Sequence, residues 1–207
     1  MKKSFFALLL ITGATHCKAQ TPVISVSSQV YNGETPGAYY KDTENVFSQF
    51  AGEWQFNNGF QFFKIKLQQK LMVYDTYNNF YEDIIVGEYL YTENDIIKVN
   101  TINLLTNNTL DPYEHNITGN IVLHKTSIPP CQDCETTEKR LYLSFGDPST
   151  DDLSLSGKIE LRRVDENGVQ KLKMILRETG NVILEDGMMP EFTSFNLPWG
   201  TYILTRP

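Results

Sequence analysis

Apolar and polar residues alternate with a period of two over much of this chain, and this pattern constrains its fold most. It is cleanest over residues 153–161, where five apolar or small residues alternate with four polar or charged ones. The first set is Leu153, Leu155, Gly157, Ile159 and Leu161, and the second is Ser154, Ser156, Lys158 and Glu160. Successive side chains of a strand point to opposite faces, so the pattern predicts strands with one buried face and one solvent-facing face.

The same alternation recurs in about nine short segments. They are residues 53–57, 60–69, 84–91, 96–104, 120–124, 141–145, 153–161, 172–177 and 201–205. Asn58-Gly59 and Asn167-Gly168 are tight-hairpin signals between two pairs of them. No long segment has a helical period, so we expect an antiparallel sandwich or a closed barrel.

Two local departures from this pattern carry expectations of their own. Asp42 or Thr43 is placed to cap a short helical turn that runs through Phe50. Phe60 and Phe62 have the opposite parity to Phe63, which predicts a bulge or burial on both faces near Phe62.

Length and charge limit the classes of protein to consider. The 207 residues are 41% hydrophobic, enough for one domain with a core. The formal net charge of -7 repels phosphate backbones, so we expect no nucleic-acid partner. Aromatic residues make up 12% of the chain, and they either fill the core or line a cavity in it.

The first residues have the composition of an export signal. Lys2 and Lys3 precede an apolar stretch over residues 5–11, which is shorter than the roughly 20 residues needed to span a bilayer. We expect an export signal over 1–19, an extended leader or tether over 20–41 and a single β domain over 42–207. Cleavage after Ala19 and lipid attachment at Cys17 both remain open, so the expected location is the periplasm, the outer membrane through a lipid anchor, or the outside of the cell.

Few residues outside the strands suggest chemistry. Cys131 and Cys134 form a Cys-x-x-Cys pair among prolines and acidic residues, which favours a structural disulfide in an exported protein over a metal or redox site. His115 has Asp111 and Glu114 beside it, and a solvated loop is the favoured interpretation over a metal site. We expect no catalytic residues, no metal and no cofactor.

Two resemblances add to this picture. Gly52-x-Trp54, placed before the first long strand, resembles the lipocalin signature, and Arg206 at the end of the last strand resembles the basic residue near that tryptophan in lipocalins. Over most of its length the chain also resembles small exported proteins of Gram-negative bacteria that form a family of unknown function. The stretches that carry this second resemblance are residues 17–20, 40–43, 50–54 and 81–91.

The first resemblance implies an all-β, antiparallel, lipocalin-like (calycin-type) barrel of about eight to nine strands with a short N-terminal helical turn. We therefore expect a non-catalytic, monomeric protein that binds a small apolar or amphipathic molecule in the barrel. The candidate ligand-binding residues are Trp54, Phe62, Phe63, Tyr89 and Tyr91. Two alternatives stay open: an envelope interaction module with a filled core, which uses loops such as 103–120, and a hydrolase that uses loop carboxylates.

Overall fold

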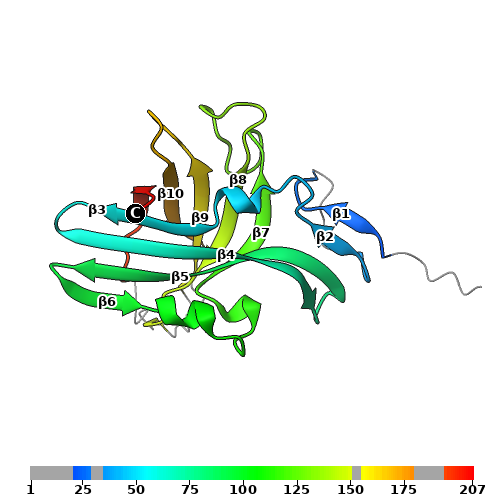
Figure 1. The fold of residues 1–207 in the computed structure, drawn as a ribbon, viewed down its shortest axis with the longest axis horizontal. Coiled ribbons are helices and arrows are strands. Elements are labelled where there is room, and N and C mark those ends of the chain that lie inside the picture. Colours follow the sequence, from blue (N-terminus) through cyan, green and yellow to red (C-terminus); the bar gives the residue numbers. More distant parts are fainter. Residues whose placement is uncertain (1–20, 29–34, 151–154, 180–193) are drawn as a thin grey trace, which may run out of the picture.

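The computed structural model describes residues 21–28, 35–150, 155–179 and 194–207, and these form one β domain (Figure 1). The export signal, Cys17 and part of the leader lie outside the described residues. Eleven strands and three 3-10 turns are present in the described part of the chain. The strands are β1 (Val23–Ser25), β2 (Tyr39–Lys41), β3 (Gly52–Asn57), β4 (Gln61–Asp75), β5 (Phe80–Glu93), β6 (Ile96–Asn100), β7 (Ile117–Leu123), β8 (Arg140–Phe145), β9 (Gly157–Arg163), β10 (Lys171–Glu178) and β11 (Gly200–Thr205).

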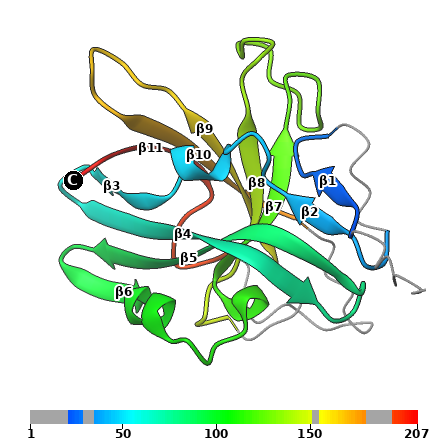
Figure 2. The same cartoon turned by 45° about the vertical axis from the view of Figure 1, so that its right-hand side comes forward.

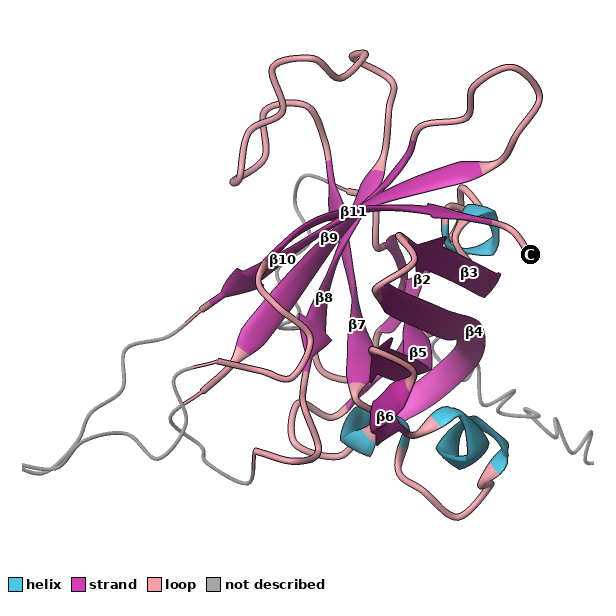
Figure 3. Cartoon of the chain, turned by 90° about the vertical axis from the view of Figure 1, so that its left-hand side faces the viewer, coloured by secondary structure: helices cyan, strands magenta, loops and turns pink. Residues whose placement is uncertain are grey.

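Eight of these strands close into an antiparallel barrel. Around the barrel, the strand order is β3, β4, β5, β7, β8, β9, β10 and β11, and each strand is hydrogen-bonded to the one before it. β11 returns to β3, where Thr205 is paired with Gln55. Figure 3 shows these strands arranged around a common interior. The all-β antiparallel barrel predicted from the sequence is confirmed.

The apolar parity of each strand faces the barrel interior. On β4, Phe63, Ile65 and Leu67 are buried, and their neighbours across β5 are Tyr91, Tyr89 and Gly87. Gly87 is required here, because a Cβ at this position would lie 2.6 Å from a Leu67 methyl carbon. The period of two therefore places a continuous apolar cluster inside the barrel.

The leader segment is packed against the barrel in part. β1 pairs with β2 and β2 pairs with β5, both in parallel (Figure 2). Tyr40 of β2 is fully buried against Phe80 in an edge-to-face contact at 4.8 Å between ring centroids. The described part of the expected tether thus contributes to the hydrophobic core.

A buried carboxylate, Asp83 on β5, ties this region together. It accepts hydrogen bonds from the Tyr39 hydroxyl (2.6 Å), the Asp42 amide (3.0 Å) and the Met72 amide (3.0 Å). Met72 has a positive φ of 53° and lies where the β4–β5 register shifts. A charged group buried to 1% exposure needs such donors, so Asp83 has a structural role in holding β2 and the β4 bulge in place.

In the segment expected to form a short helical turn, the structure has a single 3-10 turn over Phe47–Gln49. The Asp42 carboxylate accepts hydrogen bonds from the amides of Val46 and Phe47, both at 2.8 Å. Phe47 and Phe50 are fully buried and cover one end of the barrel.

The structure corrects one expected strand boundary and one expected bulge. The strand expected over 96–104 ends at Asn100, and Ile102–Thr106 forms a 3-10 turn instead, with Leu105 buried against Ile84 and Val86 on the outer face of β5. The bulge expected near Phe62 is also wrong, because the register shift in β4 lies between Lys70 and Val73; of the other alternative, burial on both faces, Phe63 is buried and Phe62 is half-buried on the outer face. The described residues include no helix with the length and apolar character needed to cross a membrane.

Candidate functional site

Trp54 and two arginines close one end of the barrel, which we call the arginine end. Trp54 is fully buried, and its indole N–H donates to the Phe50 carbonyl (2.7 Å). The guanidinium carbons of Arg206 and Arg163 lie 4.1 Å and 5.0 Å from the centre of its ring. Cation–π contacts of this kind hold the last strand and β9 against the first strand of the barrel.

Gly52 is necessary for this closure. Its φ of +108° is unfavourable for residues with a side chain, and a Cβ at this position would lie 2.0 Å from the Arg206 guanidinium. The same guanidinium donates to the Ala51 carbonyl at 2.9 Å. The residues quoted for the lipocalin resemblance therefore contact one another in the structure.

A chain of aromatic rings occupies the other part of the interior, which we call the aromatic end. Consecutive rings lie 4.6–6.0 Å apart between centroids, in the order Phe56, Tyr202, Phe63, Tyr89, Phe145, Phe195 and Trp199. These residues come from six separate segments, so only the closed barrel brings them together. Gly157 allows the close approach of Phe195, since a Cβ at this position would lie 2.6 Å from its ring.

The Tyr89 hydroxyl is the exceptional group at the aromatic end. Tyr89 is fully buried, and its hydroxyl has no hydrogen-bond partner among the described residues. By contrast, Tyr202 donates to the Pro198 carbonyl (2.5 Å), and the Tyr91 hydroxyl accepts from the Gln61 amide (2.8 Å). A buried hydroxyl without a partner costs about 1–3 kcal/mol, so it marks a place where an additional polar group would be favourable.

Burial keeps these tyrosines protonated. It raises the pKa of Tyr89 well above the usual value, and the nearby carboxylates of Asp147 and Glu88 raise it further. Burial also raises the pKa of Tyr202 to about 12, with a smaller contribution from Tyr91. The Tyr89 hydroxyl is therefore a hydrogen-bond donor at any physiological pH.

Four of the five candidate ligand-binding residues lie inside the barrel, and one does not. Trp54, Phe63, Tyr89 and Tyr91 are buried to 1% exposure or less. Phe62 is paired with Thr92 on the outer face, one residue out of phase with Phe63, so its expected place in the barrel is wrong. Sequence reasoning missed Phe56, Phe145, Phe195, Trp199 and Tyr202, because their alternation or loop position does not show which rings meet across the barrel.

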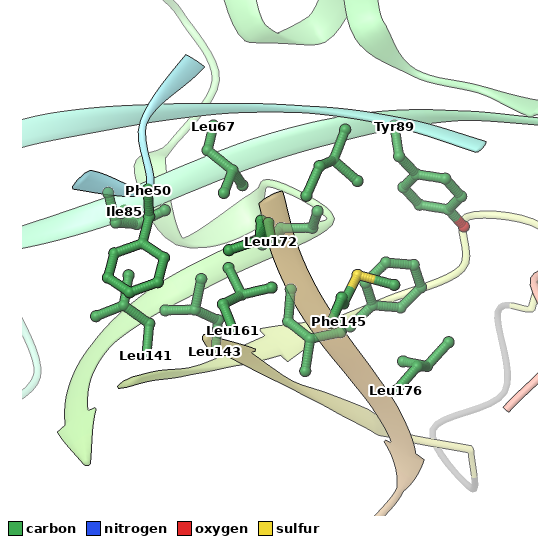
Figure 4. Close-up of a cluster of buried hydrophobic side chains, with 14 of the residues drawn as sticks. Phe50, Leu67, Ile85, Tyr89, Leu141, Leu143, Phe145, Leu161, Leu172 and Leu176 are labelled. Atoms are coloured by element: carbon green, nitrogen blue, oxygen red, sulfur yellow. The ribbon is translucent and has the colours of Figure 1, made fainter. Parts of the chain in front are cut away.

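Aliphatic side chains fill the interior between the two ends. Figure 4 shows Leu67, Ile85, Leu141, Leu143, Leu161 and Leu172 converging between Phe50 on one side and the rings of Tyr89 and Phe145 on the other. All of them are buried to 2% exposure or less. This aliphatic layer therefore separates the arginine end from the aromatic end.

The predicted disulfide between Cys131 and Cys134 is confirmed. It lies in the loop between β7 and β8, where Arg162 binds Asp133 and Glu138. Among the described residues, one group of potential ligands lies close enough together to hold a metal ion: Cys131, Asp133 and Cys134. Both of its sulfur atoms are bonded to each other in the disulfide.

Replacing both cysteines of this pair with serine is expected to lower the free energy of unfolding by about 2 kcal/mol at most, because the closed loop is so short. Urea unfolding of the variant measures this value, and wild type treated with a reductant is the matched control. A loss of more than about 4 kcal/mol would contradict the role of the disulfide as a local loop constraint.

His115 occupies a second polar site, outside the barrel. Its Nδ1 is 2.7 Å from a carboxylate oxygen of Glu88, a fully buried residue that also accepts from the Asn116 amide (2.6 Å). His115 lines an open cleft of about 580 Å³ that also contains Ser144 and Lys158. Asp111 and Glu114 are exposed, as expected for a solvated loop, but the expectation is wrong for His115, which is buried and contacts Glu88, 27 residues away.

Other groups in this cleft have ordinary structural partners. Lys158 donates to the Ser144 hydroxyl across β8 and β9 (2.7 Å), and burial lowers the pKa of the lysine. Tyr113, which also lines the cleft, donates its hydroxyl to Glu82 (2.6 Å), and Glu82 accepts from Asn120 as well. Two pairs of adjacent acidic residues that the hydrolase alternative could use, at 151–152 and 185–186, lie outside the described residues.

Comparison with known proteins gives a family and no activity. A model described as "Family of unknown function (DUF6705)" matches residues 1–207. No curated protein and no solved structure matches the chain.

Proposed function

The chain belongs to this family of unknown function, and we propose that it is an exported, non-catalytic barrel that binds a small amphipathic molecule at its aromatic end. The proposal depends above all on the Tyr89 hydroxyl, which is fully buried and has no partner among the described residues. Apolar sites with a small number of placed polar groups are typical of small-molecule binding.

The geometry of the interior supports this placement. The arginine end is covered by Trp54 and its two guanidinium groups, and the middle is filled with aliphatic side chains. The aromatic end offers ring faces and edges, together with the Tyr89 hydroxyl as a donor that has no partner in the described part of the chain. A ligand with an apolar body and one polar group matches these properties, because the rings contact the body and the hydroxyl binds the polar group.

The alternative of an interaction module with a filled core also has an observation in its favour. Phe60, Ile96 and Ile97 are 52–62% exposed, and they lie on two hairpins joined by a hydrogen bond from the Asn94 amide to the Phe60 carbonyl (2.9 Å). Exposed apolar side chains close together are typical of contact surfaces. The loop expected to make such contacts, 103–120, instead packs partly on the barrel through Leu105 and Tyr113.

Replacing Tyr89 with phenylalanine tests the proposed function. Without ligand, the variant is expected to be more stable than wild type by about 1 kcal/mol, because it removes a buried hydroxyl that has no partner. With ligand, the same change is expected to weaken binding. Chemical unfolding of delipidated protein measures the first effect. Native mass spectrometry of protein purified from its own host measures the second, as the fraction of molecules that carry a bound compound.

Tyr91 to phenylalanine is the matched control, since that hydroxyl is already bonded to Gln61. Its loss is expected to lower stability by about 1 kcal/mol. If Tyr89 to phenylalanine is destabilising and wild type carries no compound, the aromatic end is a closed core and the proposal is wrong.

A further inference from the structure

The distribution of charge along the barrel bears on which molecules the aromatic end accepts. Among the described barrel strands, the cationic side chains that face the interior are Arg163 and Arg206, and both lie over Trp54 at the arginine end. The others lie on the outward parity, and several have partners there: Lys66 with Glu53, Arg162 with Glu138 and Arg177 with Glu160. The aromatic end thus has no described cation.

Carboxylates lie close to the aromatic end instead. Asp147 is 4% exposed and, together with Glu88, acts electrostatically on Tyr89. Glu93 lies 3.4 Å from the Tyr91 hydroxyl. A ligand carboxylate placed at Tyr89 would be buried without a cation and beside like charges, which is strongly unfavourable.

Asp147 and Glu88, the two carboxylates that act on Tyr89, are already occupied by protein donors. Asp147 accepts from the amide and hydroxyl of Ser149 (3.0 and 2.6 Å) and from the backbone amide of Asn196 (2.6 Å). Glu88 accepts from His115 and Asn116. An ammonium group of a ligand buried at Tyr89 would therefore find the tyrosine oxygen, while both of these carboxylates are already bonded, so its desolvation would go uncompensated.

We infer that the aromatic end selects lipophilic molecules whose polar group is an uncharged hydrogen-bond acceptor, such as an alcohol, ketone or ester, with Tyr89 as the donor. This inference rests on the proposed function and narrows it to one ligand class. An uncharged acceptor satisfies the Tyr89 hydroxyl and adds no charge to a site that has no counter-ion.

Three probes with the same alkyl chain test the selection: decanol, decanoate and decylamine, each titrated into the delipidated full chain by calorimetry at about pH 8, where decanoate and decylamine are charged. Decanol is expected to bind at least about tenfold more tightly than either charged probe. At about pH 4, decanoate is protonated and uncharged, so its affinity is expected to approach that of decanol.

Tyr89 to phenylalanine should weaken decanol binding by about five- to tenfold and leave decanoate binding unchanged. Tyr142, on the outer face of β8, provides the matched control, and Tyr142 to phenylalanine should change neither. Decanoate or decylamine binding as tightly as decanol would overturn the inference while the barrel remains a binding site. No binding of any probe would count against the proposed function itself.

Discussion

Replacing Trp54 with alanine is expected to lower the free energy of unfolding by about 3–5 kcal/mol. The indole is fully buried, donates to the Phe50 carbonyl and is stacked by the guanidinium groups of Arg206 and Arg163. Alanine removes all three contacts at once and leaves a cavity below two cations. The loss should be large because β11 meets β3 through a short stretch of ladder, so the Arg206 contacts supply much of the closure.

Denaturant unfolding followed by far-ultraviolet circular dichroism measures this effect. Phe60 to alanine is the matched control, because that aromatic side chain is 52% exposed and its removal is expected to change stability by about 0.5 kcal/mol or less. Trp54 to phenylalanine keeps most of the packing and removes the indole donor, and should fall between the two. A loss below about 2 kcal/mol for the alanine variant would show that the arginine end does not depend on Trp54.

Replacing Glu160 with glutamine is expected to cost about 3–5 kcal/mol. Glu160 accepts from Arg140 (2.7 Å) and Arg177 (3.1 Å) on the outer face of the barrel. Arg140 is 1% exposed beneath the loop that contains the disulfide, and it also donates to the carbonyls of His124 and Pro129. Without the Glu160 charge, a buried guanidinium would be left without a counter-ion.

Two further variants separate charge from packing. Glu166 to glutamine breaks an exposed pair with Lys171 and is expected to cost less than about 1 kcal/mol. The double change of Arg140 to methionine and Glu160 to leucine should recover most of the stability lost in the single variant, since it removes both charges. Equal losses in the single and double variants would mean that the packing of the long side chains, and not their charge, is what stabilises this loop.

Local patterns in the sequence were sufficient to predict the strands and the disulfide. Alternation in segments such as 63–67 and 141–145 identified strands and their buried face, because the side-chain period of a strand follows from backbone geometry alone. The Asn58-Gly59 hairpin and the Cys131–Cys134 disulfide depend on residues a few positions apart, so they were also predictable. Phe62 was misplaced because its parity, opposite to that of Phe63, was attributed to a bulge or to burial on both faces, whereas the strand register is regular there and places Phe62 on the outer face.

The contacts that define the candidate site connect residues far apart in the chain. The Glu88–His115 pair and the packing of Phe145 against Phe195 each depend on loops that fold back over the barrel. No local pattern encodes them, because several acidic residues and many rings could have taken these positions. Similarly, Tyr89 looks like any other aromatic residue at an inward position until its hydroxyl is found without a partner.

By themselves, period-two alternation and hairpin signals determined an antiparallel β fold with an apolar interior, either a sandwich or a closed barrel, since they act over a few residues at a time. Only the tertiary structure decided which strands close the barrel, that two inward arginines gather at Trp54, and that Tyr89 faces an aromatic end where the described residues include no cation. The physical reason is that burial, hydrogen-bond satisfaction and the balance of charge belong to the space around a side chain. That space is filled by residues from every strand of the barrel.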